Sequence, residues 1–239
     1  MPTRIPSIVI TTIALAVSVA ACGSDDETTS TSTSSTSTST TTTEAVDPSK
    51  SENVNEDFGF LPPDIEVDER EGAPPPEAGE LDVEAAAEAA SCEYEGKLAD
   101  EGNTHFENPQ KEPDYGTSPP TSGDHFYSPN ETGAGALADG AFLDQPPDNR
   151  VVHSLEHGRV AIQYSPDLAE EDQLALKGLF DADRPGLLLF PNADMPFEVT
   201  ATAWTALLGC ETYEGEATIA AVAAFRDEFR GQGPEPVTF

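Results

Sequence analysis

The hydrophobic positions in the last third of the chain predict three short β-strands. Residues 160–164 and 187–190 are short, largely apolar segments with the length of a buried strand. Residues 197–203 instead alternate between apolar and polar side chains, which is the period of a strand with one buried face. The three segments therefore predict a β-sheet in this part of the chain.

Three further segments have the features of helices. Residues 167–180 follow Ser165, a residue type that often caps helices, and carry acidic residues near the first turn. Residues 81–90 are rich in Ala and Glu, which have high helix propensity. Near the C-terminus, apolar residues recur at the spacing of one helix face: Ile219, Val222, Phe225 and Phe229.

The order of these elements indicates the fold class. From residue 151 onward it is strand, helix, strand, strand, helix, which is typical of a mixed sheet with helices on it. The preceding part contains many Pro and Gly residues, which favour loops. We therefore expect an α+β fold, a small mixed β-sheet flanked by helices, with a loop-rich N-terminal half that contains Pro, Gly and His. The likeness of this order to thioredoxin-like folds carries little weight, because no Cys-x-x-Cys pair is present.

The first residues of the chain resemble an export signal. One cation, Arg4, precedes an uncharged stretch over residues 8–21 that is too short to span a bilayer. The segment Val19-Ala20-Ala21-Cys22 resembles a bacterial lipobox, in which the cysteine is acylated and becomes the new N-terminus. We expect residues 1–21 to be a lipoprotein signal peptide and Cys22 to carry the lipid. An ordinary secretory signal is the alternative.

Residues 22–80 have the composition of a disordered tether. Residues 28–43 are all Ser or Thr, and such a run cannot form a hydrophobic core. The acidic segment that follows contains Pro62-Pro63 and further prolines, so it is expected to be extended. Residues 81–239 are then expected to form the globular domain.

The charge of the chain excludes one class of function. It has 45 acidic and 11 basic residues among 239, a formal net charge of −34. We expect no binding to nucleic acid, because affinity for phosphate backbones depends on Lys and Arg. The export signal instead predicts an extracytoplasmic protein, anchored to the cell membrane through the lipid on Cys22.

Two further cysteines remain for an oxidising compartment. Cys92 and Cys210 are an even pair, which makes a disulfide the expected state. The alternative is that one or both thiolates bind a metal or take part in redox chemistry. Neither has a second Cys or a His at the spacing of a metal site.

Clustered histidines are the strongest sign of chemistry. The chain has four, all between residues 105 and 157: His105, His125, His153 and His157. His153 and His157 are four residues apart, so on one helical turn they would face the same side and could share a metal ion. A stiff loop, predicted over residues 115–125 by two prolines and two glycines, would hold His125.

These residues allow a metal site or a purely structural role. With His105 or His125 as the third ligand, the set resembles a three-histidine site for zinc or copper, and Glu156 could orient an imidazole or a bound water. In the structural alternative, the same side chains only hydrogen-bond the backbone of an irregular region.

A hydrolase is a further alternative. Residues 153–157 match the His-x-x-Glu-His pattern of inverted zinc metallopeptidases, in which the Glu is the general base. Those enzymes place the motif in a long helix, whereas here Gly158 and a predicted strand follow within three residues. The chain has neither a Gly-x-Ser-x-Gly elbow nor a glycine-rich phosphate loop. Glu156 as the general base of a metal-dependent hydrolase is therefore the second hypothesis.

Several motifs together resemble one bacterial family. They are Pro119-Pro120-Thr121-Ser122-Gly123-Asp124-His125, His153-Ser154-Leu155-Glu156-His157-Gly158-Arg159-Val160, Ala203-Trp204 and Gly233-Pro234-Glu235. Over roughly residues 91–235 the chain resembles the family called domain of unknown function 3105. Members of that family are commonly exported or membrane-anchored, and a related domain occurs in a vertebrate p53-inducible membrane protein. The chain departs from the family at Gly135-Ala136-Leu137, where an aromatic residue usually follows the glycine.

The resemblance implies no activity, because none is established for the family. It adds weight to the candidate ligands, since each matches the family's pattern: His105, His125, His153, Glu156 and His157. We expect an exported lipoprotein whose domain binds a transition metal, zinc or copper, in the cell envelope. The alternatives are the hydrolase and a non-enzymatic module that binds an envelope protein or a glycan. The single Trp, Trp204, is expected in the core.

Overall fold

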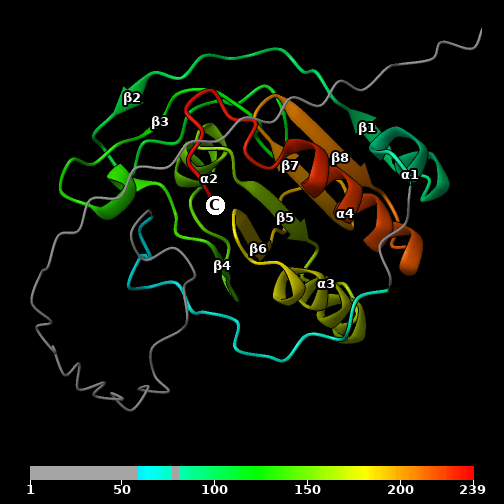
Figure 1. Ribbon diagram of the computed structural model, residues 1–239. Coiled ribbons are helices and arrows are strands. Elements are labelled where there is room, and N and C mark those ends of the chain that lie inside the picture. The colour runs from blue at the N-terminus through cyan, green and yellow to red at the C-terminus, as the bar shows by residue number, and fades with distance from the viewer. Residues whose placement is uncertain (1–58, 77–80) are drawn as a thin grey trace, which may run out of the picture. The chain divides into compact units, whose positions relative to one another are not determined.

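The computed structural model describes residues 59–76 and 81–239, which contain a central six-stranded sheet (Figure 1). Its strand order is β1-β8-β7-β5-β6-β4. The strands are β1 Glu93–Glu95, β4 Gly140–Ala141, β5 Val160–Tyr164, β6 Leu187–Pro191, β7 Val199–Ala203 and β8 Ala206–Cys210. β6 pairs in parallel with β4 and β5, and the other pairs are antiparallel. This mixed sheet, with its helices, confirms the predicted α+β fold.

Helices pack on the sheet, and short elements fill the loop-rich half. The α-helices in the described residues are α1 Val83–Ala89, α2 Asp148–Glu156, α3 Glu170–Ala182 and α4 Glu216–Phe229. The loop-rich half contains a 3₁₀ helix, η1 Thr132–Gly135, and a second sheet of two strands, β2 His105–Phe106 and β3 His125–Phe126. α1 and α4 confirm two of the predicted helices.

Successive side chains of the central strands belong alternately to two hydrophobic clusters, one on each face of the sheet. Ile162 and Leu189 pack with α1, α3 and α4 on one face of the sheet. Ala161 and Leu188 point to the other face, where α2 contributes Leu155. Successive residues of a strand point to opposite faces, so strands covered on both sides read as largely apolar runs. β5 and β6 therefore confirm the two predicted buried strands.

The strand predicted over residues 197–203 forms as β7, but the expectation of one exposed face is wrong. Thr200 and Thr202 on its polar face are fully buried. Gln163 Nε2 donates to Thr202 Oγ1 at 3.2 Å, and Asn192 Nδ2 donates to Gln163 Oε1 at 2.7 Å. These hydrogen bonds allow polar side chains to be buried at low cost. β8, which the sequence did not indicate, pairs with β7 along its whole length.

The helix predicted over residues 167–180 begins three residues later, as α3. Asp167 and Leu168 lie in a turn that precedes it. The N–H of Leu168 donates to the carbonyl of Ser165 at 2.9 Å, and the N–H of Asp167 donates to the Ser165 hydroxyl at 3.2 Å. Ser165 therefore caps a turn, and the helix starts only after it.

Residues 59–76 pack along the folded domain, and we call them the strap (Figure 1). Phe60 forms a β-bridge with Leu137, and Val67 forms one with Phe142, directly after the edge strand β4. The tether prediction is therefore wrong for the strap, because its few apolar residues find partners that composition alone does not reveal. The remainder of residues 22–80 lies outside the described residues.

The strap crosses α3 so closely that no side chain fits at Gly178. A Cβ there would overlap the backbone of Ala73, whose N–H donates to the carbonyl of Leu174 at 2.8 Å. In a helix interior Ala normally stabilises by about 0.5–1 kcal/mol relative to Gly. We predict the opposite sign for Gly178→Ala, a loss of about 1–3 kcal/mol in the free energy of unfolding, because the strap must move. Urea unfolding measures this change.

Glu171 provides the matched control, since it is an exposed position in the same helix. Comparing Glu171→Ala with Glu171→Gly gives the preference for Ala over Gly in the first turn of α3. If Gly178→Ala stabilises the protein by that same amount, the strap does not pack against α3.

A disulfide joins Cys92, which precedes β1, to Cys210, the last residue of β8, with an S–S distance of 2.02 Å. This is the pair that the cysteine count indicated. β1 and β8 are neighbours in the sheet, so the bond ties the beginning of the domain to its last third.

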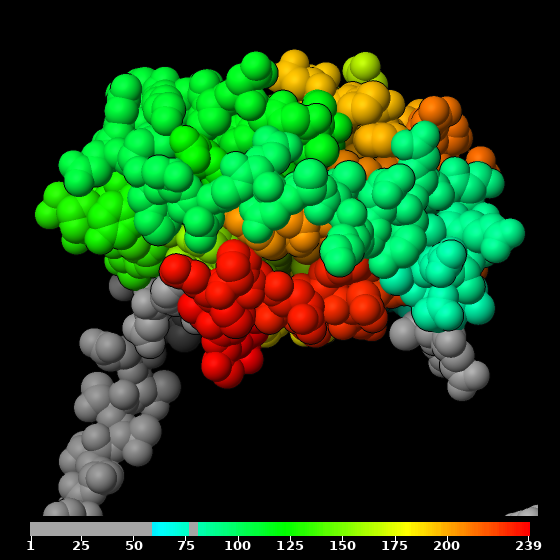
Figure 2. Space-filling model, turned by 90° about the horizontal axis from the view of Figure 1, so that it is seen from above, coloured from blue at the N-terminus to red at the C-terminus, as the bar shows by residue number. Residues whose placement is uncertain are grey.

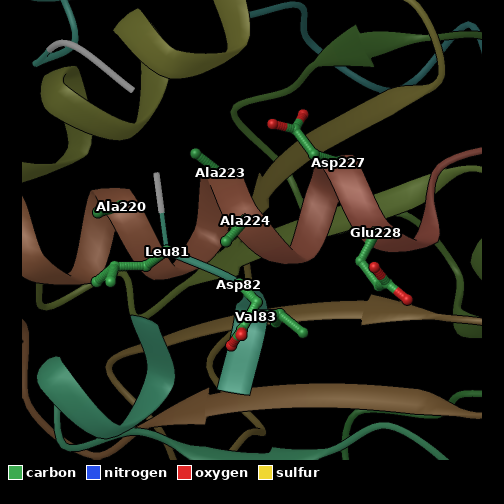
Figure 3. Close-up of a pocket in the computed structure, with 8 residues that line it drawn as sticks. All are labelled: Leu81, Asp82, Val83, Ala220, Ala223, Ala224, Asp227 and Glu228. Carbon is green, nitrogen blue, oxygen red and sulfur yellow. The ribbon is translucent and has the colours of Figure 1, made fainter. Parts of the chain in front are cut away.

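A groove lies between the start of α1 and α4 (Figure 3). Its lining includes three alanines of α4, Ala220, Ala223 and Ala224, and the carboxylates of Asp227 and Glu228. None of its eight lining residues is a histidine or a cysteine. The clustered histidines therefore lie outside this groove.

Candidate metal centre

The two-stranded sheet places two of the histidines side by side. β2 and β3 are parallel, and their register puts His105 directly opposite His125. The centroids of the two imidazole rings are 4.6 Å apart. Sequence reasoning could not foresee this pairing, because it depends on two strands of only two residues each.

The loop before β3 holds His125 as expected. It has no helix or strand over residues 115–124, and Gly123 has φ +124°, a backbone conformation that favours glycine. The carbonyl of Gly123 accepts a hydrogen bond from Nδ1 of His125 at 2.9 Å. The hydroxyl of Tyr115 donates to the carbonyl of Asp124 at 2.9 Å, which closes the loop on itself.

Helix α2 supplies the remaining ligand candidates. His153 lies on it, Glu156 is its last residue and His157 follows as the C-cap. Nδ1 of His153 donates to the carbonyl of Phe126 at 2.7 Å, which fixes the helix against β3. Gly158, with φ +85°, ends the turn as the sequence indicated.

Four of the five predicted ligands meet at one point. The candidate ligand atoms of His105, His125, His153 and Glu156 all lie within 4.8 Å of one another. We call this set the histidine cluster. Glu156 Oε2 is 3.0 Å from Nε2 of His125 and 3.3 Å from Nε2 of His105. The side chains of His125 and Glu156 are fully buried, whereas that of His105 is 37% exposed, so solvent reaches the cluster on the His105 side.

Hydrogen bonds to the backbone fix the tautomers of two imidazoles. A carbonyl can only accept, so Nδ1 carries the proton in both His125 and His153. In a neutral ring, Nε2 then carries the lone pair, as in most metal-binding histidines. In His125 this lone pair faces the Glu156 carboxylate at 3.0 Å. Two facing acceptors need a positive charge between them, either a proton, which makes His125 an imidazolium, or a metal ion.

Burial changes the ionisation of the cluster. It lowers the pKa of His153 to about 3, and the charges of the neighbouring histidines lower it further in the same direction. Burial alone would raise the pKa of Glu156. Hydrogen bonds from His125 and Asn103 and the charge of His105 outweigh it, so that this pKa falls to about 2. At neutral pH the site therefore holds a neutral His153 and a carboxylate, the states in which both bind metals.

We predict that the metal-free protein loses stability as the pH falls below about 6.5. The pKa of His153 is 6.5 in the unfolded chain and about 3 in the folded state, so its contribution is fully present above pH 6.5 and is lost as acid protonates the unfolded state. Glu156, at 4.5 and about 2, adds a loss that begins below pH 4.5. Urea unfolding between pH 7.5 and pH 5 measures this slope. His153→Gln should flatten it, and equal slopes for the two proteins would contradict the pKa of His153.

His157 does not join the histidine cluster. Its ring centroid is 5.0 Å from that of His153, but Nδ1 donates to the carbonyl of Glu235 at 2.8 Å. The structure groups it instead with Glu156 and Glu235, whose candidate ligand atoms lie within 4.8 Å of its own. The i, i+4 spacing alone therefore does not make His153 and His157 ligands of one ion.

Sequence reasoning missed several residues around the cluster. Asn103 Nδ2 donates to Glu156 Oε1 at 3.0 Å, and the ring of Tyr127 lies 5.2 Å from that of His105. Trp204, expected in the core, is half-buried: it packs beside the second hydrophobic cluster and places its ring edge-on to His125. Of Asn103, Tyr127 and Trp204, only Trp204 lies in one of the motifs on which the family resemblance rests.

The family model for proteins of unknown function DUF3105 matches residues 107–238, more than half of the chain. The chain belongs to the DUF3105 family. This confirms the resemblance, and the matched residues include His125, His153 and Glu156, whereas His105 lies two positions before them. The DUF3105 description assigns no activity. No curated protein and no solved structure matches the chain.

The predicted signal peptide and Cys22 lie outside the described residues. Within residues 59–76 and 81–239, no helix combines the length and hydropathy that a membrane span requires.

Proposed function

We propose that this DUF3105 protein binds a transition metal ion through the histidine cluster, and that it does so as an exported, membrane-anchored lipoprotein. The observation that carries the proposal is the convergence of four ligand atoms, from β2, β3 and α2, at one largely buried point. The tautomers of His125 and His153 support it, because Nε2 of each is left for a metal. A metal ion bound there would supply the positive charge that Nε2 of His125 and the facing Glu156 carboxylate need between them.

Zinc and copper fit the chemistry of the cluster best. Both bind imidazole nitrogen, and a carboxylate oxygen completes a set of four ligands for zinc. Glu156 lies among the other ligand atoms rather than beyond them, so we assign it as a ligand. The carbonyl partners of His125 and His153 and the amide of Asn103 orient three of the four ligands.

The exposure of His105 favours one second candidate, a metal-dependent hydrolase. An ion in the cluster would be reached from the His105 side by water or by a small substrate. In such an enzyme Glu156 would contact a metal-bound water and act as general base, and the ion would lower the pKa of that water. The two functions differ in the contact that Glu156 makes: it binds the ion itself in a metal-binding site, and it contacts the metal-bound water in a hydrolase.

Titration with Co²⁺ tests the cluster directly, because the visible absorption of this ion reports its coordination. We expect saturable absorption with the wild-type protein and none with the double variant His125→Gln/His153→Gln. His157→Gln is the matched control, and it should retain the affinity for the first equivalent of Co²⁺. Absorption that survives in the double variant would place the metal elsewhere.

The proposed location of the protein outside the cytoplasm rests on the predicted export signal and on Cys22. The Cys92–Cys210 bond supports it, because disulfides persist in oxidising compartments. An envelope protein or a glycan is the class of partner that such a location supplies, and the lipid on Cys22 provides contact with the membrane.

Cys22→Ala should move the exported protein from the membrane fraction to the soluble fraction. Retention in the membrane fraction would overturn the anchor.

A further inference from the structure

A second set of ligand atoms lies beside the histidine cluster and shares Glu156 with it. It consists of Glu156, His157 and Glu235, whose candidate ligand atoms all lie within 4.8 Å of one another. Glu156 is fully buried, His157 is half-buried and Glu235 is exposed. The set therefore extends from the buried cluster to the surface.

Backbone hydrogen bonds fix the C-terminal segment at this place. The N–H of Glu235 donates to the carbonyl of Glu156 at 3.0 Å, and the N–H of Val237 donates to that of His157 at 3.2 Å. These are carbonyls at the end of α2, which have no partner within the helix. A Cβ at Gly233 would overlap the backbone at Glu156, so the close approach requires glycine. Figure 1 shows this segment, in red, beside α2, and Figure 2 shows it at the surface.

The ring of His157 is oriented by the same segment. Its Nδ1 donates to the carbonyl of Glu235 at 2.8 Å, so in the neutral ring Nε2 carries the lone pair. One contact with Glu235 thus sets both the tautomer of His157 and the position of the Glu235 backbone. This repeats the arrangement at His125 and His153, where a backbone carbonyl also holds Nδ1.

Charges at this place favour a cation. The set lies at the C-terminal end of α2, where the helix dipole is negative, and it contributes two carboxylates. Burial lowers the pKa of His157, and the positive charge of Arg159 lowers it further, whereas the charges of Glu156 and Glu235 raise it. Nε of Arg159 donates to Asp139 at 2.7 Å within a buried ion pair. Asp139 carries the opposite charge in that ion pair.

We infer that Glu156, His157 and Glu235 form a second metal position, and that the Glu156 carboxylate bridges it to the ion in the histidine cluster. The inference rests on the proposed function, because the bridge needs a first ion. One imidazole and two carboxylates are a harder donor set than three imidazoles, so the second position suits Mn²⁺, Fe²⁺ or Zn²⁺. Bridged ions in two-metal proteins lie about 3.5–4 Å apart.

Loading the full-length protein with Mn²⁺ tests this inference. After removal of weakly bound metal, we expect two ions per chain in the wild type and an electron paramagnetic resonance spectrum of a spin-coupled pair. Glu235→Gln should bind one ion and give the six-line spectrum of isolated Mn²⁺. This variant keeps the backbone of residue 235, so the C-terminal segment stays docked. Glu228→Gln removes an exposed carboxylate on α4 and is the matched control, which should retain two coupled ions.

The outcomes separate the inference from the proposed function. One ion per chain in the wild type, unchanged in Glu235→Gln, would overturn the second position and leave the histidine cluster intact. Two ions that persist in Glu235→Gln, or two ions without spin coupling, would overturn the assignment of Glu235 or of the bridge. No ion in any of the proteins, with Zn²⁺ as well as with Mn²⁺, would overturn the proposed function itself.

Discussion

Glu156→Gln is expected to lower the affinity of the protein for Zn²⁺ by about 100-fold or more, because it removes a ligand rather than a group that only orients one. Glu156 Oε2 lies 3.0 Å and 3.3 Å from the Nε2 atoms of His125 and His105, in the middle of the cluster. An amide oxygen is a neutral and weaker donor for zinc than a carboxylate. Competition with a chelator of known affinity measures the change.

Asn103→Ala is the graded control for that measurement. Asn103 donates to the other oxygen of the same carboxylate at 3.0 Å, so its loss should cost only about 10-fold in affinity. Near-native Zn²⁺ affinity of Glu156→Gln would contradict the assignment of Glu156 as a ligand. If a hydrolytic activity were lost at the same time, Glu156 would be the general base.

Removal of the Cys92–Cys210 disulfide is expected to lower the free energy of unfolding by about 4 kcal/mol. The two cysteines are 118 residues apart, and a crosslink that closes so long a loop restricts the unfolded chain strongly. Urea unfolding of the double variant Cys92→Ala/Cys210→Ala measures the loss.

A reductant provides the control for the disulfide. It should destabilise the wild type by a similar amount and leave the double variant unchanged. A double variant as stable as the oxidised wild type would contradict the prediction. Further loss on reduction of the variant would indicate that another thiol contributes.

The fold was predictable where local pattern decides structure. β5 and β6 lie in the middle of the sheet, and their apolar runs match their burial on both faces. α4 was predictable from a period that one buried helix face imposes. β8 was missed because it contains Gly209 and follows a tight turn in which Thr205 has φ +57°. The strap was missed because its bridges connect residues about 75 positions apart.

The candidate site was predictable in composition but not in arrangement. Scarce histidines within a short window indicated which residues gather. Which histidines contact each other depends on the parallel pairing of β2 with β3, because that pairing brings together His105 and His125, 20 positions apart. Glu235 lay in a motif of the family resemblance, but its contact with His157 was beyond local reasoning, because the two residues are 78 positions apart.

The most direct test of the metal site is elemental analysis of the full chain with Cys22→Ala, produced by export so that Cys92 and Cys210 can pair. We predict at least one zinc or copper ion per chain after purification without added metal. The variant His125→Gln/His153→Gln, shown to be folded by circular dichroism, should contain none. A folded wild-type protein with no metal above background, and with no uptake from added zinc or copper, would contradict the account and leave the histidines with a structural role.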